Sequence, residues 1–377
     1  MKADWAYIPG GHTADDLRER AGELLPAGVF AHVIGGAGDE RTLAANRAGF
    51  GRYRLLSRVL VDVAEVDTSV DILGTRLDAP IFTCPTGGVG AVHPESESGI
   101  ARGAAAAGVG FMLSGLSSVT LEEVAAAAGP ARWQQIFWQP SREVMCDLVE
   151  RGEKADYKAV VLSVDDGDVA RRRIVRTGYR VPVEDTVANL KRYGSTEWQA
   201  RLRDRLHDPG DDVSLSWKNV EWFKSIVRVP LLLKGIMSPL DARRAVDAGV
   251  DGIILSNHGG RHLDGLPGTI EVLEEVLNAV GGKIPVLMDG GVRRATDIAV
   301  ALSLGAAAVG LGSPVVCALA CGGAEVVSAY LEDLVTDLRR ALGVLGVPNV
   351  AGLTRGHVSR IDQYVPDTVL GPFLPAR

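Results

Sequence analysis

From residue 79 onward, short apolar runs alternate with Ala-rich helical stretches, which is the βα repeat of a parallel sheet. Eight such runs occupy residues 79–87, 108–115, 132–138, 159–166, 230–236, 252–260, 285–291 and 306–312. They are continuously apolar, which is typical of strands buried on both faces. We therefore predict an α/β fold with a closed (β/α)8 TIM barrel. A doubly wound open sheet shares the alternation, but no GxGxxG opens a helix after the first strand.

The remaining segments suggest additions to one barrel domain. Residues 1–78 are predicted to form a helical cap before the barrel at 79–345, with an amphipathic segment at 43–58. A polar, charged insertion at 173–215 follows the fourth strand and is far longer than an ordinary βα loop. Such an insertion over a barrel mouth is either a lid or a disordered segment. We treat residues 1–377 as a single domain, because barrels of this size fold as one unit.

Composition and charge narrow the range of functions. Hydrophobic residues make up 46% and charged residues 23% of the chain, which is ordinary usage for a soluble globular protein. A net charge of −7 disfavours nucleic acid or an anionic membrane as partner, since both normally need a basic face. The amino terminus has no apolar core of signal-peptide length, and no stretch approaches the ~20 apolar residues that span a bilayer. We expect a cytoplasmic protein with a small-molecule substrate and no membrane contact.

The cysteines predict neither a disulfide framework nor a metal site. There are four, Cys84, Cys146, Cys317 and Cys321, and their spacing fits no zinc-ligand pattern. Cys317 and Cys321 lie on a predicted helix, where a small buried thiol is the ordinary interpretation.

Polar and glycine residues gather where the apolar runs end, and in a TIM barrel those ends form the catalytic face. The clearest example is SNHGGRHLDG at 256–265, which ends the sixth run. Two glycines allow a tight turn there, so His258 and Arg261 can both project into the barrel mouth. An imidazole can take a proton near neutral pH, and a guanidinium can bind a carboxylate through two hydrogen bonds.

Five segments resemble the FMN-dependent 2-hydroxy-acid oxidases and dehydrogenases, which include glycolate oxidase, lactate oxidase and mandelate dehydrogenase. They are CPTGGVGAVHPESE (84–97), LSVDDGDVARR (162–172), LLLKGI (231–236), SNHGGR (256–261) and MDGGVRRATD (288–297). Their order and spacing match those of the family, and the resemblance runs from about residue 15 to about residue 345. It implies an enzyme that oxidises the α-carbon of a small carboxylate with bound FMN.

The resemblance also implies roles for individual residues. His258 would remove the α-proton, or accept the hydroxyl proton if a hydride moves to the flavin. Asp165 would hold this histidine and stabilise its charged form. Lys234 would lie beside flavin N1 and O2, where negative charge builds up on reduction. Arg261 and Arg172 would bind the substrate carboxylate.

A larger set of residues is implied for FMN itself. They are Pro85, Thr86, Gly87, Ser114, Gln135, Ser163, Lys234, Ser256, Asp289, Gly290, Gly291, Arg293, Gly312 and Ser313. Within this set, the side chains of Ser114, Gln135 and Ser163 would hydrogen-bond the flavin ring. The phosphate would lie after the seventh and eighth strands, where glycines expose backbone N–H groups and Arg293 supplies charge.

Four positions depart from the family pattern. His32 and Phe137 stand where the family has substrate-facing tyrosines, and Leu116 replaces a frequent tryptophan. The loss of two phenolic hydroxyls predicts an (S)-2-hydroxy acid with a bulky or aromatic side chain, unless His32 compensates for drift in one wall. Ser313 replaces the arginine that grips the phosphate, which predicts weaker FMN retention.

Two other functions remain open at this point. One is a flavin-dependent tailoring oxidase that acts on an amine or a peptide-derived acid, and the other is a non-catalytic flavin- or phosphate-binding barrel. A binding module needs no base paired with an anion-stabilising cation, so the second is disfavoured by the joint presence of His258, Asp165, Lys234, Arg172 and Arg261. The acceptor that reoxidises the flavin is not predicted, and the resemblance implies a homotetramer.

Overall fold

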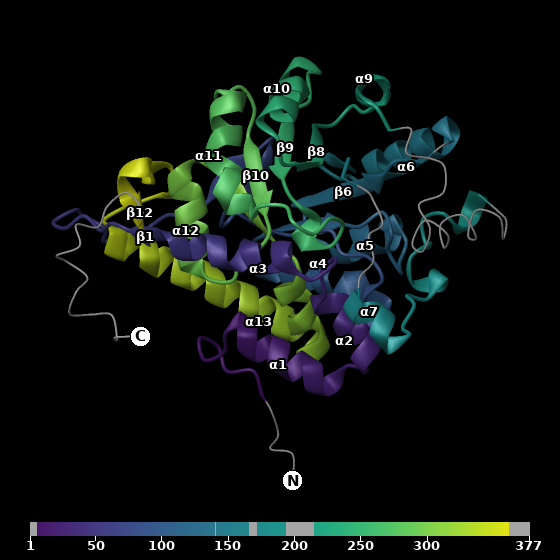
Figure 1. Cartoon of the computed structure of the whole chain (residues 1–377), viewed down its shortest axis with the longest axis horizontal. Coiled ribbons are helices and arrows are strands. Elements are labelled where there is room, and N and C mark those ends of the chain that lie inside the picture. Colours follow the sequence, from purple (N-terminus) through teal and green to yellow (C-terminus); the bar gives the residue numbers. More distant parts are fainter. Residues whose placement is uncertain (1–5, 140, 166–171, 194–214, 362–377) are drawn as a thin grey trace, which may run out of the picture.

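Eight parallel strands close into a barrel in the computed structural model, which describes residues 6–139, 141–165, 172–193 and 215–361 (Figure 1). The strands are β4 (Ile81–Thr83), β5 (Gly110–Leu113), β6 (Arg132–Phe137), β7 (Val160–Ser163), β8 (Leu231–Ile236), β9 (Gly252–Leu255), β10 (Val286–Asp289) and β11 (Ala308–Leu311). They follow one another in chain order, and β11 pairs with β4 to close the ring. All eight lie within the apolar runs, so the predicted (β/α)8 barrel is confirmed.

The interior of the barrel is packed at the end where the strands begin. Phe82 and Trp133 fill it, and both are fully buried. A hairpin of β2 (Val70–Ile72) and β3 (Thr75–Leu77) contributes to the same cluster, and Thr75 accepts a 2.9 Å hydrogen bond from the Trp133 indole. Because packing closes this end, a site can form only at the opposite end, where the strands finish.

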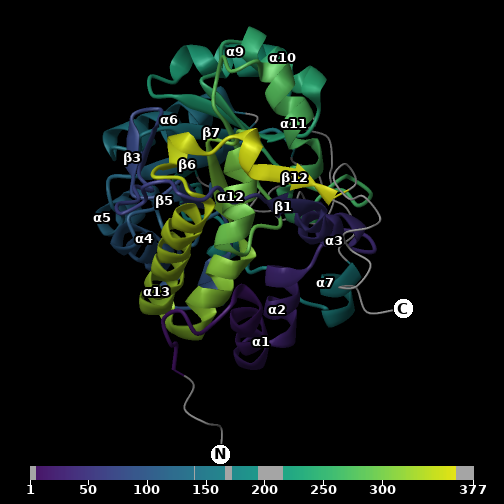
Figure 2. The same cartoon turned by 90° about the vertical axis from the view of Figure 1, so that its left-hand side faces the viewer.

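Helices form the outer layer. They are α4 (Ser96–Ala106), α5 (Leu121–Ala127), α6 (Arg142–Lys154), α9 (Trp217–Ile226), α10 (Pro239–Asp247), α11 (Thr269–Val280), α12 (Ala295–Leu304) and α13 (Ser313–Leu345). Their apolar faces pack on the outer faces of the strands in one large buried cluster. Figure 2 shows α12 and α13 side by side, and α13 also packs along α4.

The long helix α13 corrects one expectation from the sequence. By length and composition alone it could cross a membrane, although no run of that kind was expected. It is a core helix by its contacts, since 61% of its most apolar window is buried inside the protein. The backbone leaves helical geometry at Gly322 and Gly323 within it.

The cap before the barrel is helical only in its first part. It comprises α1 (Ala14–Leu24), α2 (Ala27–Ile34), α3 (Arg41–Ala48) and the 3-10 helix η1 (Gly49–Arg52). The chain then extends, and β1 (Tyr53–Leu55) pairs antiparallel with β12 (Val358–Arg360). The amphipathic segment at 43–58 therefore passes from helix into strand, because its pairing partner lies near the far end of the described chain.

Part of the insertion after β7 is described. The short helix α7 (Arg172–Thr177) lies beside α2 in both views (Figures 1 and 2). Further along, η3 (Val183–Asp185) and η4 (Lys191–Tyr193) flank a buried stretch at 186–189. The other residues of the predicted insertion, 194–214, lie outside the described residues.

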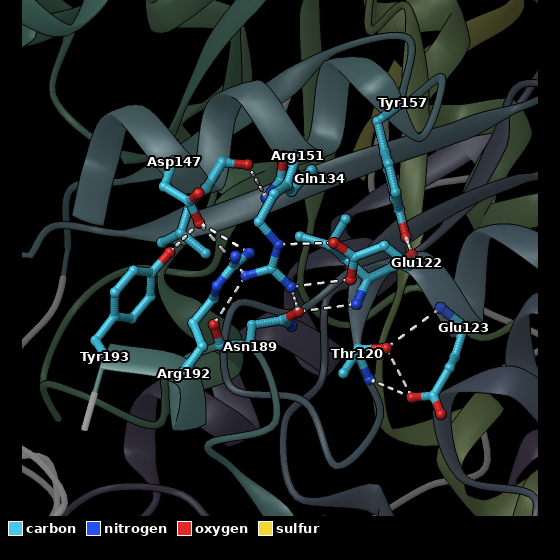
Figure 3. A network of polar contacts seen from close by, with 12 residues as sticks. Thr120, Glu122, Glu123, Gln134, Asp147, Arg151, Tyr157, Asn189, Arg192 and Tyr193 are labelled. Carbon is cyan, nitrogen blue, oxygen red and sulfur yellow. Dashed lines mark hydrogen bonds and ion pairs between the residues drawn. The ribbon is translucent and has the colours of Figure 1, made fainter. Parts of the chain in front are cut away.

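A polar network fixes the end of this stretch onto the barrel helices (Figure 3). Arg151 of α6 bonds both carboxylate oxygens of Glu122, at 2.7 and 2.9 Å, and the backbone oxygen of Asn189 at 3.0 Å. Tyr193 donates a hydrogen bond to Asp147 of the same helix. The network therefore anchors residues 189–193 of the insertion on α5 and α6.

Candidate active site

The loops at the carboxyl ends of the strands surround a cavity of about 230 Å³. The predicted site residues that line it are His32, Pro85, Thr86, Gly87, Ser114, Leu116, Phe137, Lys234, His258, Arg261, Asp289, Gly290, Gly291, Arg293, Gly312 and Ser313. Gln135, Ser163 and Ser256 are buried next to lining residues and bonded to them or to one another. The structure thus brings residues from all eight strand ends and from the cap to one place.

His258 and Asp165 form a hydrogen-bonded pair across two strand ends. Nδ1 of His258 lies 3.1 and 3.2 Å from the two carboxylate oxygens of Asp165. Burial alone would raise the pKa of Asp165, but the charge of His258 and its hydrogen bond hold that pKa well below the usual range. An ionised carboxylate only accepts, so Nδ1 carries the proton and Nε2 is the ring nitrogen left to act as a base.

The backbone at His258 is unusual. The residue opens the 3-10 helix η5 (His258–Gly260) with φ +54°, in the left-handed region that side-chain-bearing residues rarely adopt. Backbone strain of this kind is found mainly at functional sites, where the surroundings hold it in place.

Two other rings stack on His258. The ring centre of Phe137 lies 6.3 Å away, and that of His262 only 3.8 Å away with an interplanar angle of 24°. Nδ1 of His262 lies 2.7 Å from the backbone oxygen of Asp165. His262 was not among the predicted residues, although SNHGGRHLDG contains it. Asp165, His258 and His262 have metal-ligand spacing, but nearly parallel rings suit stacking better than a shared ion.

Lys234 is a buried cation held by carboxylates. Its ammonium lies 3.2 Å from Asp289 and donates to Ser256 at 2.9 Å, while Ser256 donates to Asp289 at 2.7 Å. Burial alone would lower the pKa of Lys234, but the charges of Asp289 and Asp165 raise it well above the usual value. The lysine therefore stays protonated in a dry site.

Neighbouring strand ends carry the polar side chains predicted for the flavin ring. Gln135 accepts from the Gly115 N–H at 2.9 Å and donates to Ser163 at 3.0 Å. The Ser114 hydroxyl accepts from the Leu116 N–H at 3.1 Å. These three side chains lie close together, and hydrogen bonds within the protein fix the orientation of each.

The residues predicted for the substrate carboxylate are only partly described. Arg261 lines the cavity and donates to the backbone oxygens of His32 and Gly35, at 2.6 and 3.1 Å, which ties η5 to α2. The His32 ring lies 6.1 Å from the ring of Tyr179. Arg172 begins α7, but its side chain lies outside the described residues.

Leu116 and Gly87 form one wall of the cavity. A Cβ added to Gly87 would lie 2.5 Å from the backbone oxygen of Leu116 and 2.9 Å from its Cβ. Contacts this close exclude any side chain at position 87, so Leu116 sets the surface of the wall.

The cap is docked on the barrel by polar residues that the sequence did not single out. The amides of Asn46 and Asn257 exchange two hydrogen bonds, at 2.9 and 2.8 Å. The Asp264 carboxylate accepts from the backbone N–H groups of Asp39 and Thr42 at the start of α3. The only sequence signal for these contacts was that Asp264 lies within the segment SNHGGRHLDG.

The part of the cavity after β10 and β11 suits an anion. Gly290 and Gly291 adopt φ +95° and +84°, and the Arg293 guanidinium donates to Ser313 and to the backbone oxygen of Val292, both neutral acceptors. A partly buried guanidinium with neutral hydrogen-bond partners fits a phosphate. Together with the buried Lys234, the residues present fit a phosphorylated flavin at this mouth.

Comparison with known proteins decides the family. The family model described as FMN-dependent dehydrogenase matches residues 21–360. The chain belongs to the FMN-dependent dehydrogenase family. It is 41% identical over 347 residues to a peroxisomal (S)-2-hydroxyacid oxidase of Arabidopsis thaliana, covering 91% of this chain and 95% of the relative.

Two further similar proteins are named as mandelate or hydroxymandelate oxidases. The 4-hydroxymandelate oxidase of Amycolatopsis orientalis is 39% identical over 345 residues, covering 90% of this chain and 96% of the relative. A solved structure of mandelate oxidase with (S)-2-phenylpropionate superposes with a TM-score of 0.84 at 37% identity, over 94% of this chain and 98% of that one. The chain is thus a flavoenzyme of the 2-hydroxy-acid oxidase family with FMN as cofactor. The non-catalytic barrel and the amine-directed tailoring oxidase are not favoured.

Proposed function

We propose that this FMN enzyme oxidises an (S)-2-hydroxy acid with a bulky, aromatic side chain to the 2-oxo acid. The observation that carries the proposal is the pairing of His258 with the ionised Asp165 at a cavity that Lys234 also lines. A base, a supporting carboxylate and a buried cation are the groups that this oxidation needs from a protein.

In this proposal His258 takes up the proton. Nε2 accepts it from the α-carbon or from the hydroxyl group, while Nδ1 stays bonded to Asp165. The imidazolium that forms is stabilised by the ionised carboxylate beside it. Lys234 remains protonated and presents a fixed positive charge at the cavity wall. Bound FMN supplies the acceptor for the two electrons.

The substrate carboxylate is assigned to the arginines. Arg261 lines the cavity and is held by two backbone oxygens of the cap, so its guanidinium is oriented before a substrate arrives. Arg172 is assigned the same task through the family resemblance. A carboxylate requirement follows, and the corresponding amide or alcohol should be a poor substrate.

The side-chain preference rests on the apolar walls. Leu116, Phe137 and Val181 line the cavity and provide no hydroxyl group for a small polar substrate. Burial of ~100 Å² of phenyl surface at ~25 cal/mol per Å² contributes about 2.5 kcal/mol, or roughly 70-fold in binding. The 4-hydroxymandelate oxidase among the relatives supports this preference.

The test is anaerobic stopped-flow reduction of the flavin by glycolate, lactate, mandelate, 4-hydroxymandelate and phenyllactate. We expect the aryl acids to reduce it fastest. A control with Phe137→Tyr and Leu116→Trp restores the residues frequent in the family and should shift the preference toward the smaller acids. Fastest reduction by glycolate in the unmodified enzyme would contradict the assignment of these walls. No reduction by any acid would contradict the proposed base.

We also propose a single domain over residues 1–377, a cytoplasmic location, a homotetramer and a lid role for 173–215. The described cysteines are all free thiols, which reducing compartments favour. The net charge of −7 supports the expected absence of nucleic-acid and membrane partners. Cell fractionation and light scattering test the location and the tetramer, and the peroxisomal relatives make a peroxisome the competing location.

A further inference from the structure

Two arginines approach each other just beyond the glycine turn after β10. The Arg293 guanidinium donates to the backbone oxygen of Val292 at 3.2 Å and to the Ser313 hydroxyl at 3.3 Å. No carboxylate in the described part of the chain hydrogen-bonds to this guanidinium. Burial lowers the pKa of Arg293, and the positive charge of Arg47 lowers it further. The charge of Asp15 opposes part of this effect, and an anion bound between the two guanidinium groups would oppose it further.

The packing of α3 brings Arg47 to this place. A Cβ added to Gly291 would lie 1.9 Å from the backbone oxygen of Asn46 and 3.3 Å from the backbone nitrogen of Arg47. The last turn of α3 therefore rests directly on the glycine turn, which only glycine permits here. Hydrogen bonds from the Asn46 amide to Asn257 and from the Thr269 N–H to Asn46 hold the helix in that position.

Arg47 also lies where two cavities meet. One is the cavity at the barrel mouth, and the other is a larger cleft of about 1100 Å³ between the cap and α12. Arg47, Gly291 and Arg293 line both. On the cleft side Arg47 forms an ion pair with Asp15 of α1, and both side chains are partly exposed.

We propose that Arg47 binds the phosphate of FMN together with Arg293, in the role that the family gives to an arginine at the position of Ser313. A phosphate between the two guanidinium groups would turn their repulsion into paired, charge-assisted hydrogen bonds. The α13 helix begins at Ser313, and the N–H of Ser313 adds to the same anion site, whereas Pro314 has no N–H and the N–H groups of Val315 and Val316 bond to the Gly312 oxygen. Weak FMN retention was predicted from the replacement of the family arginine by Ser313 alone. In this proposal the cap supplies the guanidinium that position 313 lacks, through Arg47.

The inference rests on the FMN site used in the proposed function, and a competing explanation is that Arg47 only joins α3 to α1 through Asp15. The two explanations predict different effects on the binding of FMN and of riboflavin. A residue that binds phosphate discriminates FMN from riboflavin, which lacks the phosphate. A residue that only holds the cap in place affects both flavins equally.

The experiment measures the binding of FMN and of riboflavin to the full chain stripped of flavin, by quenching of flavin fluorescence. We expect Arg47→Gln to weaken FMN binding by about 10- to 100-fold and to leave riboflavin binding unchanged. Two control variants should keep the affinity for FMN. Asp15→Asn breaks the ion pair but keeps Arg47, and Arg54→Gln removes a charge that lines the cleft but not the barrel-mouth cavity.

A second substitution guards against a folding defect. Ser313→Arg added to Arg47→Gln restores a guanidinium at the family position and should recover most of the affinity for FMN. Equal loss of FMN and riboflavin in Arg47→Gln would overturn the inference, and so would an equal loss of FMN binding in Asp15→Asn. A failure of the unmodified chain to bind either flavin would instead contradict the FMN site and the proposed function.

Discussion

Substitution of Asp165 by asparagine isolates the charge that supports the base. The two side chains have nearly the same shape, so the close packing of Asp165 against Gly235 is kept. The carboxylate oxygens lie 3.1 and 3.2 Å from Nδ1 of His258, and the side chain is only 14% exposed. A hydrogen bond to a charged group of this kind is worth about 1.5–3 kcal/mol. We therefore expect flavin reduction to slow by about 10- to 150-fold.

The loss can be larger, because an asparagine amide can also donate to Nδ1. That bond would move the ring proton to Nε2, the atom that has to accept the proton from the substrate. The asparagine variant would then combine a lost charge with the wrong tautomer of His258. Both effects act on the proton transfer, so FMN binding should be unchanged.

The pH dependence gives an independent readout. The pKa of Asp165 is held well below the usual range, so its stabilising effect is present above the ordinary carboxyl pKa and is lost only as the pH falls through the depressed value. Asp165 therefore stays charged from pH 5 to 9. A fall in the flavin reduction rate at the acid end of this range comes from the protonation of a different group. Asp165→Asn removes this charge at every pH in the range, so the slower flavin reduction should be seen across the whole profile.

The assay is anaerobic stopped-flow reduction of bound FMN across this pH range, with flavin absorbance and thermal melting as controls for occupancy and folding. A reduction rate within about threefold of the unmodified enzyme across this pH range would refute the role given to Asp165. A rate loss accompanied by loss of FMN would point to a structural role instead.

Two other predictions follow from neighbouring contacts. His258→Ala should slow flavin reduction by ~10²–10⁴-fold in stopped flow and leave FMN bound, and near-normal reduction would contradict its role as base. Arg151→Met removes the contacts with Glu122 and Asn189, each worth roughly 1 kcal/mol at most at this partly exposed site, so limited proteolysis within 183–193 should speed up about fivefold. Lys154→Met on the same helix is the control, and equal proteolysis of both variants would show that the network does not anchor the segment.

The sequence predicted the barrel and most of the cavity lining for one physical reason. Each barrel strand is a short apolar run that can be recognised locally, and the ends of parallel strands in a closed barrel meet at one face. Asp165 and His258 follow β7 and β9, far apart in the chain, and their contact was predicted from the resemblance to the family. The resemblance to the family then supplied roles that position alone could not.

The contacts that the sequence did not reveal join the barrel to the cap and the insertion. The pairing of β1 with β12, the Asn46–Asn257 amide pair and the approach of Arg47 to Arg293 all depend on how separate segments pack. A local hydrophobic pattern contains no information about such packing. His262 differs from these residues, because its role depends on stacking against His258, which a single histidine in a loop sequence does not indicate.

Two cations of the cavity, the buried Lys234 and the partly buried Arg293, show how the fold prepares different chemistry with similar charges. Lys234 is bonded to Ser256 and paired with Asp289, so its positive charge survives burial that would otherwise remove its proton. Arg293 needs no such protection, since a guanidinium stays charged in proteins, and its hydrogen bonds go to neutral oxygens. A cation already matched by a carboxylate can oppose negative charge that develops during a reaction without binding an anion tightly beforehand. A cation without a matching carboxylate favours an anion that stays, which is what a cofactor phosphate requires.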